Sequence, residues 1–289
     1  MDPGVVLGDW GNSRLRLWLM RGGAVVEGRE ASGMARASDP RAALEALLDG
    51  WPARRVILCG MAGARNGLHE APYLRCPANL ADWLEQAAEL ALNGRTLTIA
   101  PGIADRERPD VMRGEEAQVF GALAIDPALC AGRQQFLLPG THSKWVDVSD
   151  GRIVRFQTHM TGELFELLSH SSLFAVAPDD TRTDEKGFAA GLARSAEERD
   201  LGGALFEARA AQLIAGKSPA WGRGFVSGLL IGAEVRAHAR SGLDGVVLIG
   251  DPRLTALYSE ALAGMAANAA VLDSEACAIA GLRLLNADN

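Results

Sequence analysis

The sequence has 289 residues, of which 48% are hydrophobic and 22% charged, and its formal net charge is −7. This composition is typical of a globular protein and allows one large domain or two of ordinary size. An acidic chain without a basic stripe argues against nucleic acid as a partner, and no apolar run approaches the ~20 residues that cross a membrane. Four separated cysteines and the lack of a leader pattern predict a cytoplasmic protein with reduced, mostly buried thiols.

The N-terminal part alternates between strand and helix patterns. Alternating apolar residues around a Gly-Gly turn predict a three-stranded meander over residues 5–30. A helix is expected over 40–51, a buried strand over 54–63, a helix over 80–92 and a strand over 95–102.

The opening pattern recurs in the second part of the chain. An apolar strand runs into a small-residue turn at 135–143, and two further strands follow at 144–149 and 151–160. A layout that occurs twice indicates an internal duplication, although any two β-meanders share this pattern. We place the boundary near residue 132, which predicts domains 1–132 and 133–289.

The rest of the second part is mainly helical. The most polar stretch, 175–187, predicts a surface loop or lid, and 245–251 predicts a buried strand. Close helix–helix approach is expected at Gly228 and Gly232 and at Ala280 and Gly281. Helices are predicted at 162–174, 204–216, 223–239, 252–265 and 274–285.

Two turns between strands carry residue types that bind phosphate, because small residues expose backbone N–H groups. In the first, "GDWGNS", the Asp9 carboxylate lies beside Gly11, Asn12 and Ser13, where it could hold Mg²⁺. The second turn, "PGTHSK", offers Gly140, Thr141, His142, Ser143 and Lys144. Either turn alone reads as an ordinary hairpin, but two at equivalent places of a repeat favour a polyphosphate ligand.

The stretch "MRGEEAQVFGAL" begins an apolar helix with two adjacent glutamates, Glu115 and Glu116. The helix dipole alone would explain acids at this position. A carboxylate at a helix start can also act as a general base.

The two turns resemble the phosphate loops of the actin/hexokinase/Hsp70 ATPase superfamily. The resemblance implies an α/β fold of two ribonuclease-H-like domains with ATP in an interdomain cleft. Pro139 replaces an acid often found in the second loop, so Asp9 would be the main carboxylate near the metal. It also implies that Gly250 and Asp251 contact adenosine and that the last helix packs back towards the first domain.

In sugar kinases of that superfamily, a glycine–acid pair opens a helix before the second phosphate loop, and its acid is the base. Gly114-Glu115 is similar, which implies Glu115 as the base, with Glu116 second. More narrowly, "LGDWGNSRLRLWL", "VMRGEEAQVFGA", "LPGTHSKWV" and "GLLIGAEV" resemble the 2-dehydro-3-deoxygalactonokinase family. That resemblance implies ATP- and Mg²⁺-dependent phosphorylation of the terminal hydroxyl of 2-dehydro-3-deoxy-D-galactonate.

A sugar acid needs a cation for its carboxylate, and the planar fork of arginine suits this role. An arginine is also often only a solvated surface residue, and Thr161 with Glu163 could be a helix cap without a ligand. The candidate substrate-binding residues are Arg16, Gly63, Arg65, Arg113, Thr161, Gly162 and Glu163.

Other functions share these patterns. The first loop also resembles type III pantothenate kinase, and an acid-opened helix before a phosphate loop also occurs in exopolyphosphatases, which use water. A non-catalytic sugar sensor would not need an acid at Glu115. The sequence leaves open whether the protein forms a homodimer.

Overall fold

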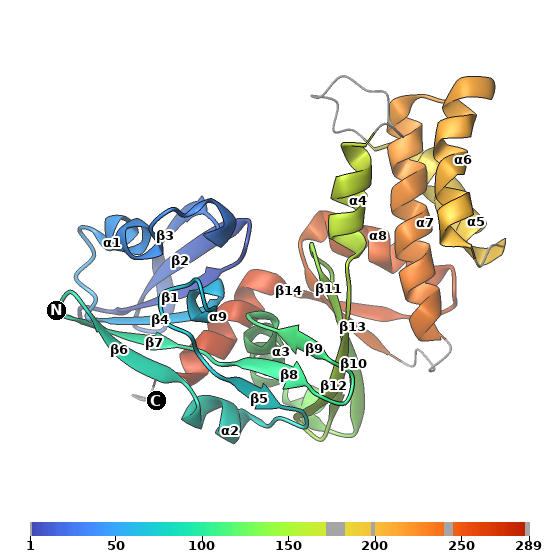
Figure 1. Ribbon diagram of the computed structural model, residues 1–289. Helices are drawn as coiled ribbons and strands as arrows, with labels where there is room; N and C mark the ends of the chain where they lie inside the picture. Colours follow the sequence, from blue (N-terminus) through green and yellow to red (C-terminus); the bar gives the residue numbers. More distant parts are fainter. Residues whose placement is uncertain (1, 172–182, 198–199, 240–244, 287–289) are drawn as a thin grey trace. The chain divides into compact units, whose positions relative to one another are not determined.

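The computed structural model describes residues 2–171, 183–197, 200–239 and 245–286 (Figure 1). Its strands are β1 (Val5–Trp10), β2 (Arg14–Arg21), β3 (Ala24–Ser32), β4 (Arg55–Gly60), β5 (Tyr73–Arg75), β6 (Ala88–Leu92), β7 (Arg95–Ile99), β8 (Gly102–Asp105), β9 (Asp110–Met112), β10 (Arg133–Leu138), β11 (Ser143–Ser149), β12 (Arg152–His159), β13 (Val246–Gly250) and β14 (Ala269–Asp273). Its α-helices are α1 (Pro40–Leu48), α2 (Leu80–Glu85), α3 (Glu115–Ile125), α4 (Thr161–Ser169), α5 (Glu185–Glu197), α6 (Leu201–Ile214), α7 (Pro219–Ala239), α8 (Pro252–Ala263) and α9 (Ser274–Leu284). Short 3₁₀ turns lie at η1 (Met34–Arg36), η2 (Met61–Gly63) and η3 (Pro127–Cys130).

Two larger sheets repeat one layout. Their strand orders are β3-β2-β1-β4-β7-β6 and β12-β11-β10-β13-β14, and β5-β8-β9 form a small third sheet. In each larger sheet a three-stranded meander is followed, later in the chain, by a strand that pairs with the first strand of the meander. The duplication predicted from the sequence is therefore confirmed in the topology.

The chain divides into two compact units. The first comprises Met1–Phe136, Val146–Gln157 and Leu272–Asn289, and the second comprises Leu137–Trp145 and Thr158–Val271. Strands β10, β11 and β12 contribute residues to both, and α9 belongs to the first unit. The predicted domains, 1–132 and 133–289, stay a prediction.

In the first unit, α1 packs on one face of the six-stranded sheet. Asp39 caps this helix by accepting a 3.1 Å hydrogen bond from the backbone N–H of Ala42. Leu44 and Leu48 of α1 are fully buried and share one apolar cluster with Leu17 and Val56 of the sheet. Since successive strand residues point to opposite faces, the alternation in β2 directs this apolar set towards α1.

Helices α3 and α9 pack through glycine within the first unit. A Cβ at Gly121 would lie 1.8 Å from the carbonyl oxygen of Cys277, and one at Gly281 would lie 1.9 Å from that of Ala117. The two backbones therefore touch, as the sequence predicted for Gly281. This contact fixes α3, whose first residue is Glu115, against the α9 segment that follows the last strand.

Gly281→Ala is expected to destabilise the protein by about 3 kcal/mol, because the helices must separate to admit a methyl group. Chemical denaturation of purified protein measures this change. Gly264→Ala is the matched control: its φ is −60° and its Cβ would lie 3.4 Å from the nearest atom, an ordinary contact. Equal stabilities of the two variants would contradict the glycine packing.

In the second unit, α5 and α7 also pack backbone to backbone. A Cβ at Gly228 would lie 2.1 Å from the carbonyl oxygen of Phe188, and one at Gly232 would lie 2.2 Å from the Ser195 hydroxyl. The close approach predicted at both positions is confirmed. A glycine on the opposing helix, Gly191, likewise faces the carbonyl oxygen of Phe225.

Some predicted elements differ in the structure. The helix predicted over 80–92 ends at Glu85, and Ala88–Leu92 forms the edge strand β6, because pairing with β7 outweighs local helix propensity. The sequence patterns also missed α5 and the strands β5, β8, β9 and β14. The predicted loop at 175–187 lies mostly outside the described residues, and its last three residues begin α5.

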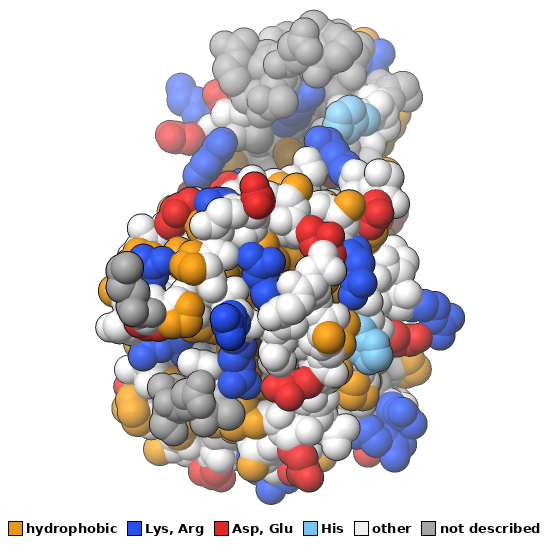
Figure 2. Space-filling model, turned by 90° about the vertical axis from the view of Figure 1, so that its left-hand side faces the viewer, with side chains coloured by type: hydrophobic (Ala, Val, Ile, Leu, Met, Phe, Trp, Pro, Cys, Tyr) orange, Lys and Arg blue, Asp and Glu red, His pale blue; other side chains and the backbone are white. Residues whose placement is uncertain are grey.

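The prediction of reduced, mostly buried thiols agrees with the structure. All four cysteines are unpaired, with Cys59 and Cys277 buried and Cys76 and Cys130 half-buried. Among the helices of the described ranges, none is long and apolar enough to cross a membrane. Lys and Arg side chains lie among Asp and Glu side chains on the face drawn in Figure 2.

Candidate active site

The first predicted phosphate loop is a tight turn between β1 and β2. The backbone N–H of Gly11 donates to the carbonyl oxygen of Arg14 at 2.8 Å, which closes the turn. η1 supports it from behind, because Met34 and Ala35 donate to the carbonyl oxygens of Gly11 and Asn12. Asn12 and Ser13 are exposed at the tip. The turn is thus held rigid while its polar tip stays accessible.

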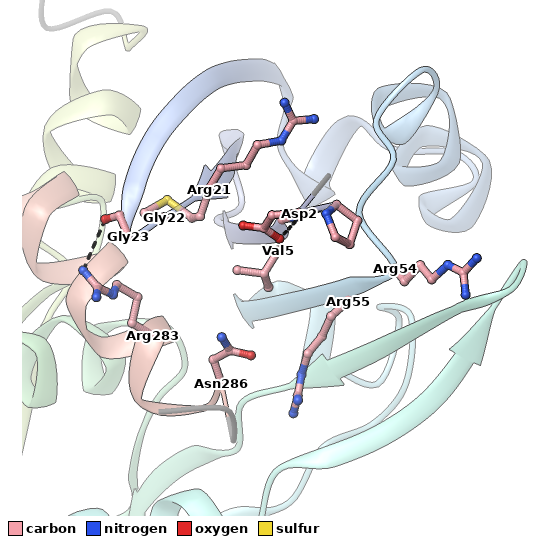
Figure 3. A pocket seen from close by; sticks show the side chains of 12 residues that line it. Asp2, Val5, Arg21, Gly22, Gly23, Arg54, Arg55, Arg283 and Asn286 are labelled. Atoms are coloured by element: carbon pink, nitrogen blue, oxygen red, sulfur yellow. Dashed lines mark hydrogen bonds between the residues drawn. The ribbon is translucent and has the colours of Figure 1, made fainter.

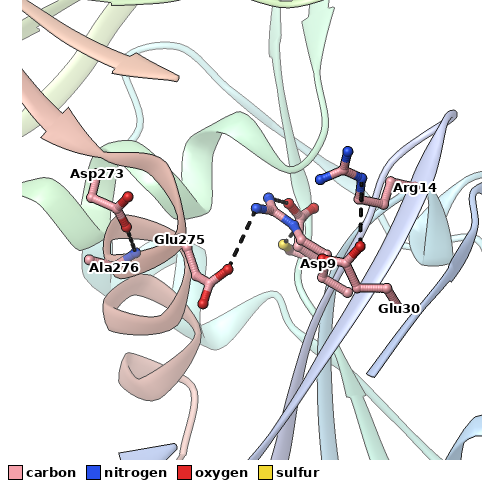
Figure 4. A network of polar contacts seen from close by, with 8 residues as sticks. Asp9, Arg14, Glu30, Asp273, Glu275 and Ala276 are labelled. Atoms are coloured by element: carbon pink, nitrogen blue, oxygen red, sulfur yellow. Dashed lines mark hydrogen bonds and ion pairs between the residues drawn. The ribbon is translucent and has the colours of Figure 1, made fainter. Parts of the chain in front are cut away.

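Asp9 is the second-last residue of β1 and lies opposite Arg16 on β2. Its Oδ2 accepts a 2.7 Å hydrogen bond from Arg16 Nη2, and the buried Cys59 thiol lies 3.7 Å from its Oδ1. Arg16 also lies 4.0 Å from Glu275 of α9, so it bridges two carboxylates. Figure 4 shows the two acids, Asp9 and Glu275. Arg16 is therefore engaged by Asp9 and Glu275.

The Cys59 thiol is an inert neighbour of Asp9. Burial raises the pKa of Cys59 well above its usual range, and the charges of Asp9 and Glu116 raise it further. The thiol therefore stays protonated and can donate its S–H to Asp9.

Two glycines let the chain pass closely around Asp9. Gly60 ends β4 with φ of 77°, and Gly114 precedes α3 with φ of 114°, a region that favours glycine. A Cβ at Gly114 would lie 3.2 Å from the Cα of Gly60 and 3.9 Å from Asp9 Oδ1. The start of α3 is therefore placed directly beside the carboxylate of the first loop.

The two glutamates that open α3 have different surroundings. Glu116 is fully buried, and both of its carboxylate oxygens lie 2.8 Å from the backbone nitrogen of Gly114. Burial, with the nearby charge of Glu115, raises the pKa of Glu116 to about 8. Glu115 is half-buried, and its Oε2 accepts a 3.1 Å hydrogen bond from the backbone N–H of Arg113. Of the two, Glu115 is the one that solvent reaches.

Arg113 is held against the η2 turn. Its guanidinium stacks 4.1 Å from the centre of the Tyr73 ring, and its Nη2 donates to the carbonyl oxygen of Ala71 at 2.8 Å. Its Nη1 is buried and has no hydrogen-bond partner, and a Cβ at Gly63 would lie 2.6 Å from it. The structure therefore brings Arg113 and Gly63 together and leaves one donor of Arg113 available.

Arg65 does not join this group. Its side chain is 89% exposed, and its Nε lies 3.5 Å from Glu70 Oε1. The predicted role of Arg65 in substrate binding therefore has no support from its position in the structure.

The second predicted phosphate loop lies on the start of α4, within the second unit. The backbone N–H of Glu163 donates to the carbonyl oxygen of Thr141 at 2.9 Å, and a Cβ at Gly162 would lie 2.4 Å from the carbonyl oxygen of Gly140. His142 Nε2 lies 2.5 Å from Glu163 Oε2. The two predicted sets, 140–144 and 161–163, are therefore one cluster.

Three further residues of this unit have structural neighbours. Lys144 is buried, and its Nζ donates to the carbonyl oxygen of His142 at 3.2 Å. Gly250 faces Pro139, which lies 3.3 Å from where its Cβ would be. Asp251 caps α8 by accepting a hydrogen bond from the backbone N–H of Arg253 at 2.9 Å. The predicted adenosine segment thus lies beside the second loop.

The sequence patterns did not identify Glu234, a buried carboxylate of α7. The side chains of Ser143, Trp145, Thr161 and Tyr258 all donate to it. The available signal was a single acid inside the otherwise apolar stretch "GLLIGAEV".

The donors around Asp9 fit a magnesium ion that arrives with a nucleotide. Nowhere in the described ranges do three or more His, Cys, Asp or Glu side chains gather as a metal site. Magnesium commonly takes one or two carboxylates and completes its shell with waters and substrate phosphates. A carboxylate offers about four lone-pair positions. Arg16 and Cys59 occupy two of these on Asp9, which leaves room for such a ligand.

A separate cavity of about 450 Å³ lies in the first unit, near the start of β1 (Figure 3). Arg21, Arg54, Arg55 and Arg283 line it, but their guanidinium groups point in different directions (Figure 3). Arg283 Nη1 lies 3.5 Å from the carbonyl oxygen of Gly23. These cations do not converge on one ligand position.

The duplicated sheets and the loops at equivalent places define an α/β protein of the actin/hexokinase-like ATPase class, with two ribonuclease-H-like halves. The fold is shared with the activator of the 2-hydroxyisocaproyl-CoA dehydratase from Clostridium difficile with bound ADPNP. That structure has a TM-score of 0.54 and 12% identity, over 98% of this chain and 94% of that one.

The chain belongs to the 2-keto-3-deoxy-galactonokinase family, whose sequence model matches residues 9–285. It is 40% identical to "Probable 2-dehydro-3-deoxygalactonokinase DgoK1" of Rhizobium meliloti (strain 1021), over 95% of this chain and 94% of the relative. It is 33% identical, with the same coverage of both chains, to the 2-dehydro-3-deoxygalactonokinase of Escherichia coli (strain K12). The crystal structure of a Sinorhizobium meliloti protein provisionally named 2-dehydro-3-deoxygalactonokinase has a TM-score of 0.91 and 38% identity, over 98% of this chain and 95% of that one.

Proposed function

We propose that this chain transfers the γ-phosphoryl group of ATP to the terminal hydroxyl of 2-dehydro-3-deoxy-D-galactonate, giving the 6-phosphate and ADP. The observation that carries the proposal is the placement of Gly114, and hence of the start of α3, beside Gly60 and Asp9. A helix that begins with two glutamates therefore lies next to the first predicted phosphate loop, in a chain that belongs to this kinase family. Phosphoryl transfer needs little beyond positioning, charge stabilisation and a base.

Glu115 is the proposed base. It would accept the proton of the terminal hydroxyl while that oxygen attacks the γ-phosphorus and the bond to the β-phosphate oxygen breaks. Glu115 is half-buried, and its Oε2 is oriented by the backbone N–H of Arg113. Glu116 suits the role less, because it is fully buried and both of its oxygens are within hydrogen-bonding distance of Gly114 N.

The proposed phosphate-binding elements are the turn at Gly11, Asn12 and Ser13 in the first unit and the turn at 140–144 in the second. Bound Mg²⁺ would supply charge neutralisation for the phosphates, and Asp9 would hold it. Because the Ser143 hydroxyl donates to Glu234 at 2.8 Å, a phosphate contact of Ser143 would use its backbone N–H. The adenosine contact of Gly250 and Asp251, the cytoplasmic location and the homodimer all stay predictions.

The roles of Arg16 and of the α4 cluster are part of the proposal. Arg16 would orient Asp9, to which it is paired at 2.7 Å, rather than bind the sugar acid. Thr161, Gly162 and Glu163 would place the second loop, with which Gly162 and Glu163 share backbone contacts. Arg65 stays a substrate-binding prediction without a structural argument.

Arg113→Gln is expected to raise the KM for the sugar acid by about 10- to 100-fold, with a smaller change in kcat. The reason is that Arg113 Nη1 is the buried unpartnered donor beside Gly63, suited to the substrate carboxylate. Steady-state kinetics at saturating ATP measure it. Arg106→Gln removes an exposed arginine of the same unit and should leave KM unchanged. An unaltered KM in Arg113→Gln would show that Arg113 does not bind the substrate carboxylate. Arg65→Gln would then test the other candidate arginine.

The proposed function is tested by a coupled assay of ADP release. We expect release that depends on 2-dehydro-3-deoxy-D-galactonate, with no release in water alone. ADP release that depends on pantothenate instead would identify pantothenate as the acceptor. ADP release without any added acceptor would indicate a hydrolase. Binding of the sugar acid without turnover would overturn the kinase assignment.

A further inference from the structure

Glu234 lies on α7 in the second unit, with 3% of its surface exposed. Its Oε1 accepts hydrogen bonds from the Ser143 hydroxyl and the Trp145 indole N–H, both at 2.8 Å. Its Oε2 accepts hydrogen bonds from the hydroxyls of Thr161 and of Tyr258, the latter at 2.7 Å. Four donors on two oxygens fill the acceptor capacity of a carboxylate.

All four partners can donate to Glu234. The indole N–H of Trp145 can only donate, and burial, with Glu234 beside it, raises the pKa of Tyr258 well above its usual range, so that the Tyr258 hydroxyl stays protonated and able to donate. A buried side chain that is satisfied by four donors holds each donor in one position.

The four donors come from three segments that carry proposed nucleotide-site residues. Ser143 belongs to the second phosphate loop and begins β11, Trp145 follows it on β11, and Thr161 begins α4, on which that loop rests. Tyr258 lies on α8, which begins directly after Gly250 and Asp251. Glu234 therefore hydrogen-bonds to all three segments.

We propose that Glu234 is a positioning residue of the nucleotide site: it fixes the second phosphate loop, the start of α4 and helix α8 in one arrangement. The inference rests on the proposed kinase function. Glu234 itself does not touch the nucleotide. Its effect on nucleotide binding passes through Ser143, Thr161 and Tyr258.

Tyr258→Phe tests the proposal with little disturbance, because it removes one donor and keeps the aromatic ring. We expect the Kd for ADP, measured by titration calorimetry without sugar acid, to rise about 10-fold. The KM for ATP should rise equally, while the KM for the sugar acid stays unchanged. Glu234→Gln should raise the Kd for ADP further, since the amide can replace only one of the two acceptor oxygens.

Ser195→Ala is the matched control. Ser195 is a buried hydroxyl of the same unit, and its partners are Leu192 and Arg236, outside the Glu234 network. It should lower the melting temperature without altering the Kd for ADP. A Tyr258→Phe protein with wild-type Kd and a lowered melting temperature would overturn the inference, leaving Glu234 a purely structural residue. The Tyr258→Phe result decides the inference even if Glu234→Gln fails to fold. A wild-type protein that binds no ADP would instead overturn the proposed function.

Discussion

Glu115→Gln is expected to lower the turnover of sugar-acid phosphorylation by about 10²- to 10⁴-fold, while ATP binding stays near that of the wild type. Glutamine keeps the size of the side chain, and its carbonyl oxygen can still accept the hydrogen bond from Arg113 N–H that orients Glu115. What it cannot do is take the proton of the attacking hydroxyl. Single-turnover kinetics and ATP titration separate the two effects.

Glu107→Gln is the control, because Glu107 is an exposed glutamate in the loop between β8 and β9 of the same unit. It should retain wild-type turnover. Near-normal turnover in Glu115→Gln together with a large loss in Glu116→Gln would assign the base to Glu116. Near-normal turnover in both would remove the base from this helix.

Glu116 is expected to make the stability of the protein fall as pH rises from about 4.5 to about 8. Its ordinary pKa of 4.5 applies to the unfolded chain, and burial raises the pKa in the folded protein to about 8. Between these values the folded state keeps a proton that the unfolded state has released, so the free energy of unfolding decreases with pH. The contribution is fully present below 4.5 and is lost above about 8, on the order of 5 kcal/mol in total.

Glu116→Gln should remove this dependence, because glutamine stays neutral in both states while its oxygen can still accept from Gly114. The difference in free energy of unfolding between variant and wild type should therefore grow in favour of the variant as pH rises. Urea denaturation at several pH values between 5 and 9 measures it. Glu107→Gln should give a difference that does not change with pH. A constant difference for Glu116→Gln would show that Glu116 is not held protonated.

Much of the first loop and of the α3 start could be predicted from sequence because both depend on local chemistry. The residues Gly-Asn-Ser after an apolar strand predict a tight turn, and a pair of acids after a glycine predicts the start of a helix. The edge strand β6 could not be predicted, because Ala88–Leu92 has ordinary helix formers and becomes a strand only through pairing with β7. Tertiary pairing, rather than local preference, decided that segment.

Glu234 and Arg113 show the same limit at the site. The sequence names a glutamate in an apolar helix and an arginine before a helix, and neither pattern identifies its partners. Ser143 and Thr161 lie 91 and 73 positions from Glu234 in the sequence, and Tyr258 lies 24 positions from it, yet all three hydroxyls donate to Glu234. Arg113 meets Tyr73 across 40 positions. Contacts of this range depend on how the elements pack.

By itself the sequence determined the duplicated strand layout, the two phosphate-type turns, the acid-opened helix and the family resemblance, since each is encoded in short stretches of neighbouring residues. Only the tertiary structure decided which glutamate is accessible, which arginine keeps an unpartnered donor, and that one buried carboxylate ties three segments together. The physical reason is that burial and hydrogen-bond partnership are set by distant residues, through the packing of glycine-lined helices and paired strands.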